Sequence, residues 1–212
     1  QEADYMLVYS AYEQGRPNAV ELLKDYLDVY PASRHADEVN FLIGSAHFGQ
    51  GEYQKAIFWF NESNIDMLSP DQQEAYCFRL AYSLLQIGDM EKARGYFARI
   101  EQIGTKYREA STYYVAYIDY ATGKYNNALV EFTRFKDLPD YKERSLYYTT
   151  QTYIIQNKYE NVISEGKELL ASYPDSENNS EVYRIMGNAY YHLGNEDQAI
   201  NTLSKYVSST DS

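Results

Sequence analysis

The stretch Gly51-Glu52-Tyr53-Gln54-Lys55-Ala56-Ile57 decides the fold, because its pattern of a turn glycine followed five residues later by a small alanine recurs along the chain. Three further copies are Gly88-Asp-Met-Glu-Lys-Ala93, Gly123-Lys-Tyr-Asn-Asn-Ala128-Leu129 and Gly194-Asn-Glu-Asp-Gln-Ala199-Ile200. Two weaker copies complete the series, with Gln14 and Asn157 in place of the glycine and Ala19 and Val162 in place of the alanine. The anchors at residues 19, 56, 93, 128, 162 and 199 are separated by 37, 37, 35, 34 and 37 residues. A period of this size indicates a stack of small helix-turn-helix units.

Residues of matching size recur at two fixed distances from each anchor. Twelve residues before it stands a small residue, namely Gly44, Ala81, Ala116, Thr150 and Gly187, with Leu7 as the exception. Four residues after it stands a large apolar residue, namely Leu23, Phe60, Phe97, Phe132 and Leu203, with Gly166 as the exception. This alternation of small and large residues within one period resembles the tetratricopeptide repeat.

The resemblance implies an all-α fold, a right-handed α-α superhelix (a tetratricopeptide-repeat solenoid) of about six helix-turn-helix repeats, forming a single array over residues 1–212. The predicted repeats are residues 1–33, 34–70, 71–105, 106–139, 140–176 and 177–212. We expect first helices near 3–13, 35–50, 71–87, 106–122, 140–156 and 179–193, and second helices near 17–30, 53–63, 89–102, 125–136, 159–172 and 196–208. Residues that stop a helix fall where the second helices should end, namely Pro31, Pro70, Pro139 and Pro174, with Gly104 in this place in the third repeat.

Composition argues against several functions. The formal net charge is -12, from 19 Lys and Arg against 31 Asp and Glu, so a nucleic-acid partner is not expected. No apolar run approaches the ~18 residues that a membrane-spanning helix needs, so we expect no transmembrane segment. His35, His47 and His192 lie in different repeats without metal-ligand spacing, and the single Cys77 has no paired histidine. We therefore predict no catalytic residues, no metal and no cofactor, and conclude that the chain is not an enzyme.

Two junctions between repeats share one short motif, Tyr30-Pro31-Ala-Ser33 and Tyr173-Pro174-Asp-Ser176. This motif is similar to the junctions of bacterial envelope tetratricopeptide proteins, such as the outer-membrane assembly lipoproteins and the Tol-Pal coordinator protein. The resemblance implies a location in the bacterial cell envelope or periplasm, with the cytoplasm as the alternative. A plainer interpretation is that proline ends one helix and serine caps the next, which any helix array needs.

The tyrosines are far out of proportion, at 25 against 8 phenylalanines. The resemblance implies that first helices line a concave face, with exposed positions 15, 14, 11 and 8 residues before each anchor. The partner-binding candidates on this face are Phe78, Arg79, Tyr82, Tyr113, Tyr114, Tyr117, Tyr120, Tyr147, Tyr148 and Gln151. Rigid rings with polar tips beside an arginine concentrate binding energy at protein interfaces. The alternative is that some of these rings pack between adjacent repeats.

Arg184 and Asn188 complete the candidate set, one turn apart on the same predicted face. They resemble one part of the residue pair with which chaperone-binding repeats grip a peptide C-terminal carboxylate. Tyr147 and Gln151 occupy the corresponding positions of the preceding repeat, so a full carboxylate clamp is not expected.

The sequence therefore predicts a non-enzymatic scaffold that binds a protein or peptide partner along a tyrosine-rich concave groove. An envelope glycan-binding module is the first alternative, because aromatic faces also stack on sugar rings. A purely architectural segment of a longer repeat protein is the second. The last helix carries an apolar stripe of Ile200, Leu203, Tyr206 and Val207, which predicts either a continuation of the chain beyond Ser212 or a homodimer through this helix.

Overall fold

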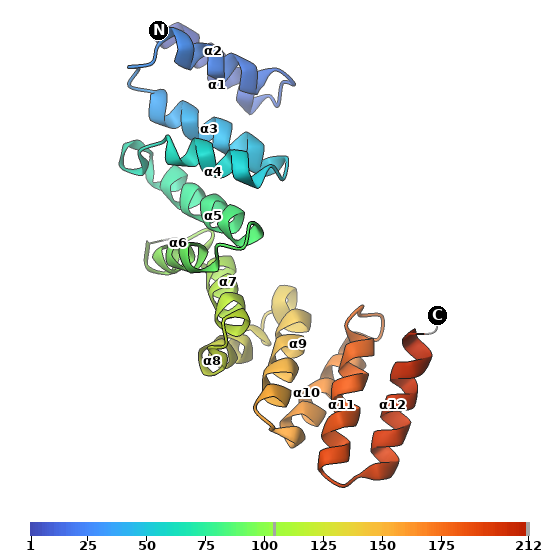
Figure 1. The fold of residues 1–212 in the computed structure, drawn as a ribbon. Helices are drawn as coiled ribbons and strands as arrows, with labels where there is room; N and C mark the ends of the chain where they lie inside the picture. Colours follow the sequence, from blue (N-terminus) through green and yellow to red (C-terminus); the bar gives the residue numbers. More distant parts are fainter. Residues whose placement is uncertain (104, 211–212) are drawn as a thin grey trace. The chain divides into compact units, whose positions relative to one another are not determined.

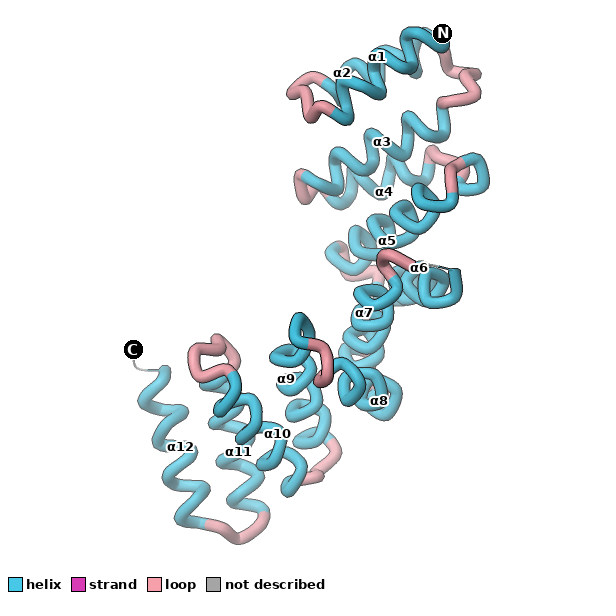
Figure 2. The backbone as a smooth tube through the Cα atoms, turned by 180° about the vertical axis from the view of Figure 1, so that it is seen from behind, coloured by secondary structure: helices cyan, strands magenta, loops and turns pink. Residues whose placement is uncertain are grey.

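The computed structural model describes residues 1–103 and 105–210, and within this part of the chain all regular structure is helical (Figures 1 and 2). The predicted all-α fold is confirmed. The role predicted for Gly104 lies outside the described residues. The chain divides into two compact units, Gln1–Tyr114 (unit 1) and Val115–Ser212 (unit 2), each of which is treated by itself. No helix among the described residues combines the length and apolarity needed to cross a membrane.

Helices follow one another as pairs of neighbours in both units. Unit 1 contains α1 Glu2–Glu13, α2 Ala19–Val29, α3 Ala36–Gly49, α4 Tyr53–Asn61, the 3-10 turn η1 Ile65–Met67, α5 Pro70–Gln86 and α6 Met90–Ile103. The division falls within α7 Arg108–Ala121, and unit 2 continues with α8 Tyr125–Phe135, α9 Pro139–Ile155, α10 Tyr159–Ser172, α11 Asn179–His192 and α12 Glu196–Thr210. The pairs α1 with α2, α3 with α4, α5 with α6, α9 with α10 and α11 with α12 pack against each other.

The turns explain why the repeated motif begins with glycine. Gly51 and Gly88 have φ of 73° and 88°, in the left-handed region that side chains with a Cβ avoid. Asn157 holds the same place with φ of 57°, and asparagine is among the few other residues that tolerate this conformation. In the first turn the left-handed residue is Gly15 rather than Gln14, so that copy is shifted by one position.

The predicted match between small and large residues is a direct contact between the helices of one pair. A methyl group added at Gly44 on α3 would lie 2.7 Å from Cδ1 of the buried Phe60 on α4. In the last pair, a methyl group at Gly187 would lie 2.6 Å from Cγ of Leu203. The small residue therefore lets two backbones approach until a large side chain of the second helix fills the space.

The exception at Gly166 has a packing reason as well. A methyl group there would lie 2.7 Å from Cγ of Met186, a buried side chain of the following helix α11. Thr150, at the position that is glycine or alanine in four other repeats, is fully buried. Gly166 stands where the other repeats have a large apolar residue. Met186 of the following repeat fills the space that such a side chain would occupy beside α10.

Both Tyr-Pro-x-Ser junctions form the same local turn. The backbone N–H groups of Ser33 and Ser176 donate to the carbonyls of Tyr30 and Tyr173 at 3.0 and 3.1 Å. Each serine hydroxyl then accepts from the backbone N–H two residues later, at 3.1 Å for Ser33 and 3.2 Å for Ser176. This geometry agrees with the plainer interpretation of the motif, a turn that ends one helix and leads into the next.

Two of the helix-stopping prolines have a different role from the one predicted. Pro70 and Pro139 are the first residues of α5 and α9, not the last of α4 and α8. Proline suits this position because the first turn of a helix leaves its N–H groups without intrahelical partners. Ser69 completes the start of α5 by a reciprocal cap with Gln72.

Candidate functional site: an aromatic groove in unit 1

Unit 1 contains a groove of about 340 Å³ bounded by α1, α3, α5 and the segment 105–107. Its lining includes the aromatic residues Tyr9, Tyr12, Phe41 and Tyr107 and the charged residues Glu13, Asp71, Glu74, Arg79 and Lys106. This volume lies within the range of ligand-binding pockets, and the mixed aromatic and charged lining suits a partner that also carries polar groups.

Arg79 is the charged residue at the aromatic wall of the groove. Its guanidinium carbon lies 5.6 Å from the ring centroid of Phe41, a cation-π distance. Burial raises the pKa of Tyr12, and the adjacent Arg79 guanidinium offsets part of this rise. Among the described residues, no carboxylate oxygen lies within 4.0 Å of the Arg79 guanidinium, the distance that defines an ion pair. The groove therefore holds a half-buried positive charge that the protein does not neutralise by direct pairing.

Glu74 of α5 fixes the segment that closes the groove. Its carboxylate accepts hydrogen bonds from the backbone N–H groups of Thr105 and Tyr107, at 2.9 and 2.6 Å. Tyr107 in turn stacks on Phe78 with ring centroids 4.6 Å apart. Because Glu74 is buried and its charge is satisfied by these donors, it serves as a structural acceptor rather than as a free ligand group.

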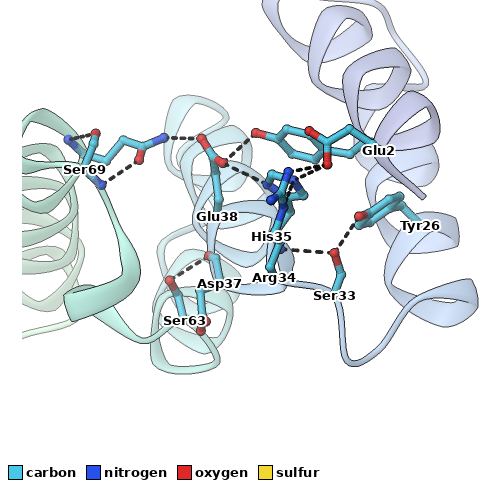
Figure 3. A network of polar contacts seen from close by, with 11 residues as sticks. Glu2, Tyr26, Ser33, Arg34, His35, Asp37, Glu38, Ser63 and Ser69 are labelled. Atoms are coloured by element: carbon cyan, nitrogen blue, oxygen red, sulfur yellow. Dashed lines mark hydrogen bonds and ion pairs between the residues drawn. The ribbon is translucent and has the colours of Figure 1, made fainter.

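A network of polar contacts joins the three helices that line the groove (Figure 3). The Tyr5 hydroxyl of α1 donates to one carboxylate oxygen of Glu38 in α3, at 2.6 Å. The other oxygen of Glu38 accepts from the side-chain amide of Gln72 in α5, also at 2.6 Å. Tyr5 stacks on His35 at 3.7 Å, and His35 contacts Glu2 at 3.1 Å. Glu38 of α3 thus links α1 and α5, two of the helices that line the groove.

The candidate residues predicted from the sequence are divided between the two units. In unit 1 only Arg79 lines the groove. Phe78, Tyr82 and Tyr114 form a ladder of rings, with Tyr82 and Tyr114 5.5 Å apart and Phe78 5.8 Å from Phe97 of α6. Tyr113 is 4% exposed. The contacts of Phe78 and Tyr82 with Tyr114 of α7 join adjacent repeats, which is the alternative that the sequence left open.

In unit 2 the predicted tyrosines gather around Tyr148. Its ring stacks on Phe132 at 5.2 Å and contacts Tyr117 and Tyr120 at 5.5 and 5.1 Å. Burial raises the pKa of Tyr148 to about 12. Tyr147 lies 5.3 Å away, and all four tyrosine rings are half-buried. This cluster combines packing with some accessible ring surface.

Arg184 and Gln151 are engaged within unit 2. Arg184 donates to both oxygens of Glu181, at 2.7 and 2.6 Å, which lowers the pKa of the Glu181 carboxyl. Gln151 donates to the Tyr147 hydroxyl at 3.1 Å and approaches Glu181 at 3.4 Å. Asn188 is exposed. A ligand carboxylate would therefore have to compete with Glu181 for Arg184.

The surroundings of His47, His192 and Cys77 indicate that these side chains have structural roles. His47 is buried and its Nδ1 lies 2.5 Å from Glu52, whereas His192 stacks on Tyr159 at 4.7 Å. Cys77 is buried, and burial raises the pKa of its thiol, which disfavours the reactive thiolate. In residues 1–103 and 105–210 no group of three or more His, Cys, Asp or Glu side chains is placed to hold a metal ion.

Sequence reasoning missed Tyr9, Tyr12, Tyr107 and Glu74. The two tyrosines of α1 lie far from the middle of the chain, where the density of aromatic residues suggested the site. Glu74 carried a signal, since Glu38 and Glu74 stand 18 and 19 residues before their anchors. A carboxylate near the start of a first helix can accept hydrogen bonds from the next repeat, as Glu38 does from Gln72 and Glu74 from Tyr107.

Comparison with known proteins supports the repeat assignment. A family profile of the tetratricopeptide repeat matches residues 5–65, and a second profile of the same repeat matches residues 74–102 and 181–209. Together these segments make up more than half of the chain. A comparison with curated proteins gives no significant match.

Several solved structures have the same fold. MamA of strain AMB-1 is 13% identical over 82% of this chain and 91% of its own, with a TM-score of 0.69. YrrB, described as a TPR protein with an unusual peptide-binding site, is 10% identical over 89% of this chain and 92% of its own, also with a TM-score of 0.69. A tetratricopeptide repeat protein from Parabacteroides merdae ATCC 43184 is 17% identical over 98% of this chain and 78% of its own, with a TM-score of 0.65. At such identities the likeness establishes the fold alone. With the matched profiles and the repeat packing described above, it identifies this chain as a tetratricopeptide-repeat protein.

Proposed function

We propose that this chain is a non-enzymatic scaffold and that the groove of unit 1 binds an extended segment of a partner protein. The observation that carries this proposal is the open volume between α1, α3 and α5, lined by Tyr9, Tyr12, Phe41 and Tyr107. Rings with polar tips bind peptides well because they offer a large contact area and lose little conformational freedom. The description of YrrB as a protein with a peptide-binding site gives a precedent within the same fold.

The test begins with selection of peptides from a displayed random library by the immobilised chain. A synthetic copy of a selected peptide is then titrated against the wild type, Tyr9→Ala and the control Tyr191→Ala. Tyr9 lines the groove, whereas Tyr191 is 67% exposed and belongs to unit 2. We expect Tyr9→Ala to weaken binding about thirtyfold, the effect of losing about 2 kcal/mol at an interface hot spot. Equal affinity of all three proteins would rule out the groove as the binding site.

The half-buried rings of Tyr117, Tyr120 and Tyr147 in unit 2 are a second candidate surface, which corresponds to the tyrosine-rich face predicted from the sequence. Its phenol, amide and carboxylate groups would also suit a glycan, since planar polar side chains beside aromatic rings bind sugars. The same titration with Tyr117→Ala, using peptides and soluble cell-wall fragments as probes, separates these uses.

A bacterial envelope location is a separate proposal, supported by the resemblance of the two Tyr-Pro-x-Ser junctions. Fractionation of cells that express the full-length natural protein tests it directly. Recovery of the protein only in the cytoplasmic fraction would contradict it.

A further inference from the structure

We propose that the groove of unit 1 selects a segment with an acidic side chain, whose carboxylate pairs with Arg79. This inference rests on the proposed function and adds the chemistry of the ligand. It starts from the contrast between Arg79 and two other cations of the chain. Arg184 donates to both carboxylate oxygens of Glu181, and Lys136 donates to both oxygens of Glu165 at 2.7 and 2.8 Å. Arg79 has no such carboxylate among the described residues.

The surroundings of Arg79 favour the binding of an anion to its guanidinium group. Contact with the Phe41 ring at 5.6 Å stabilises its charge and limits its side-chain motion, but leaves hydrogen-bond donors of the guanidinium without acidic partners. A half-buried guanidinium has lost part of its hydration, so pairing with a carboxylate regains more free energy there than at a fully exposed site.

The other charged residues of the groove do not fill this role. The Glu74 carboxylate faces the N–H groups of Thr105 and Tyr107, which satisfy it. Glu13 and Asp71 are exposed at the rim, where water and salt screen their repulsion of an incoming anion. Lys106 stands 5.2 Å above the Tyr107 ring and adds a second positive charge to the groove.

The aromatic residues of the groove come from segments far apart in the chain. Tyr9 and Tyr12 belong to α1, whereas Tyr107 belongs to the segment 105–107 that follows α6. Arg79 of α5 lies beside Tyr12 and Phe41. A segment of several residues can therefore contact these rings while one of its acidic side chains reaches Arg79.

The experiment uses random peptides fused by their C-termini to a phage coat protein, so that no peptide has a free terminal carboxylate. Selections are run with the wild-type chain, Arg79→Gln and the control Arg16→Gln. Arg16 is exposed, belongs to the first turn of unit 1 and does not line the groove. Circular dichroism melting of each variant shows whether it folds, and Arg79→Lys tests whether charge alone is sufficient.

We expect the wild type and Arg16→Gln to enrich Asp or Glu at one position of the peptide, and Arg79→Gln to lose this enrichment. A synthetic peptide from the wild-type pool should bind Arg79→Gln about tenfold to a hundredfold more weakly, the range for a charge-assisted hydrogen bond. Replacing the acidic residue of the peptide by its amide should weaken binding to the wild type by a similar factor and to Arg79→Gln by little.

Two contrary results have different meanings. Enrichment of peptides without an acidic position, or an acidic preference that Arg79→Gln retains, would overturn this inference and leave the groove as a peptide site. Failure of the wild type to enrich any peptide would overturn the proposed function and this inference with it.

Discussion

A single methyl group at Gly44 tests the helix packing on which the whole repeat register depends. In the structure, the Cβ of Gly44→Ala would lie 2.7 and 2.8 Å from Cδ1 and Cε1 of Phe60. Phe60 is fully buried, so its ring has no free space into which it could move. The substitution must therefore push α3 and α4 apart or force the ring from its preferred rotamer.

The expected magnitude follows from two opposing effects. Overpacking of a dense core costs roughly 1–3 kcal/mol. Alanine gains about 0.5–1 kcal/mol over glycine inside a helix, because it loses less conformational freedom on folding. The net expectation is a destabilisation of roughly 0–2.5 kcal/mol, against the stabilisation that the helix-propensity gain alone would give.

Gly95→Ala is the matched control, because Gly95 lies within α6 and an added methyl group there meets nothing within 4 Å. We expect this variant to be stabilised by about 0.5–1 kcal/mol, the helix-propensity gain alone. Urea unfolding followed by the fluorescence of Trp59, the one tryptophan of the chain, reports on α4 next to Phe60.

The free energies of unfolding of Gly44→Ala and Gly95→Ala decide the outcome. If Gly44→Ala is stabilised as much as Gly95→Ala, then α3 and α4 do not approach as closely in solution as the structure shows. The assignment of small and large positions around each anchor would then be wrong.

Three further predictions concern the candidate surfaces and the end of the array. Tyr113→Ala should cost roughly 3–5 kcal/mol in thermal or urea unfolding, as a buried aromatic does, whereas Tyr117→Ala on the half-buried cluster should cost clearly less; equal losses would show that both rings are packing residues. The hydrogen bonds from Arg184 lower the pKa of Glu181 from its ordinary 4.5, so their contribution to stability is present above pH 4.5 and is lost as the pH falls through the lowered pKa. Glu181→Gln should therefore flatten the pH dependence of unfolding in that acidic window, and an unchanged profile would contradict this account. If two chains pair through α12, Ile200→Asp should lower the mass measured by sedimentation equilibrium, since Ile200 is 66% exposed; a wild type that stays monomeric at high concentration would exclude the pairing.

The helical fold and its register could be determined from the sequence because they depend on local rules. Turn glycines with positive φ and small residues opposite large ones recur at fixed spacing, and all six anchor residues are buried. The sequence also identified Arg79 as a candidate. It also predicted Phe78 and Tyr113 on the binding face, although both rings are packed inside the repeats. Spacing within one helix cannot distinguish a ring that lines a groove from a ring that packs against the next repeat.

Only the tertiary structure decided which charged and aromatic groups are available to a partner. Glu74 reaches the backbone of residues 105 and 107, and Glu38 reaches Tyr5 and Gln72, contacts that join residues more than 30 positions apart. Arg184 is neutralised by Glu181 three residues before it, yet Arg79 on an equally regular helix has no such partner among the described residues. Helical periodicity fixes the direction of a side chain from its own helix, whereas its burial and its partners depend on how neighbouring repeats dock against it.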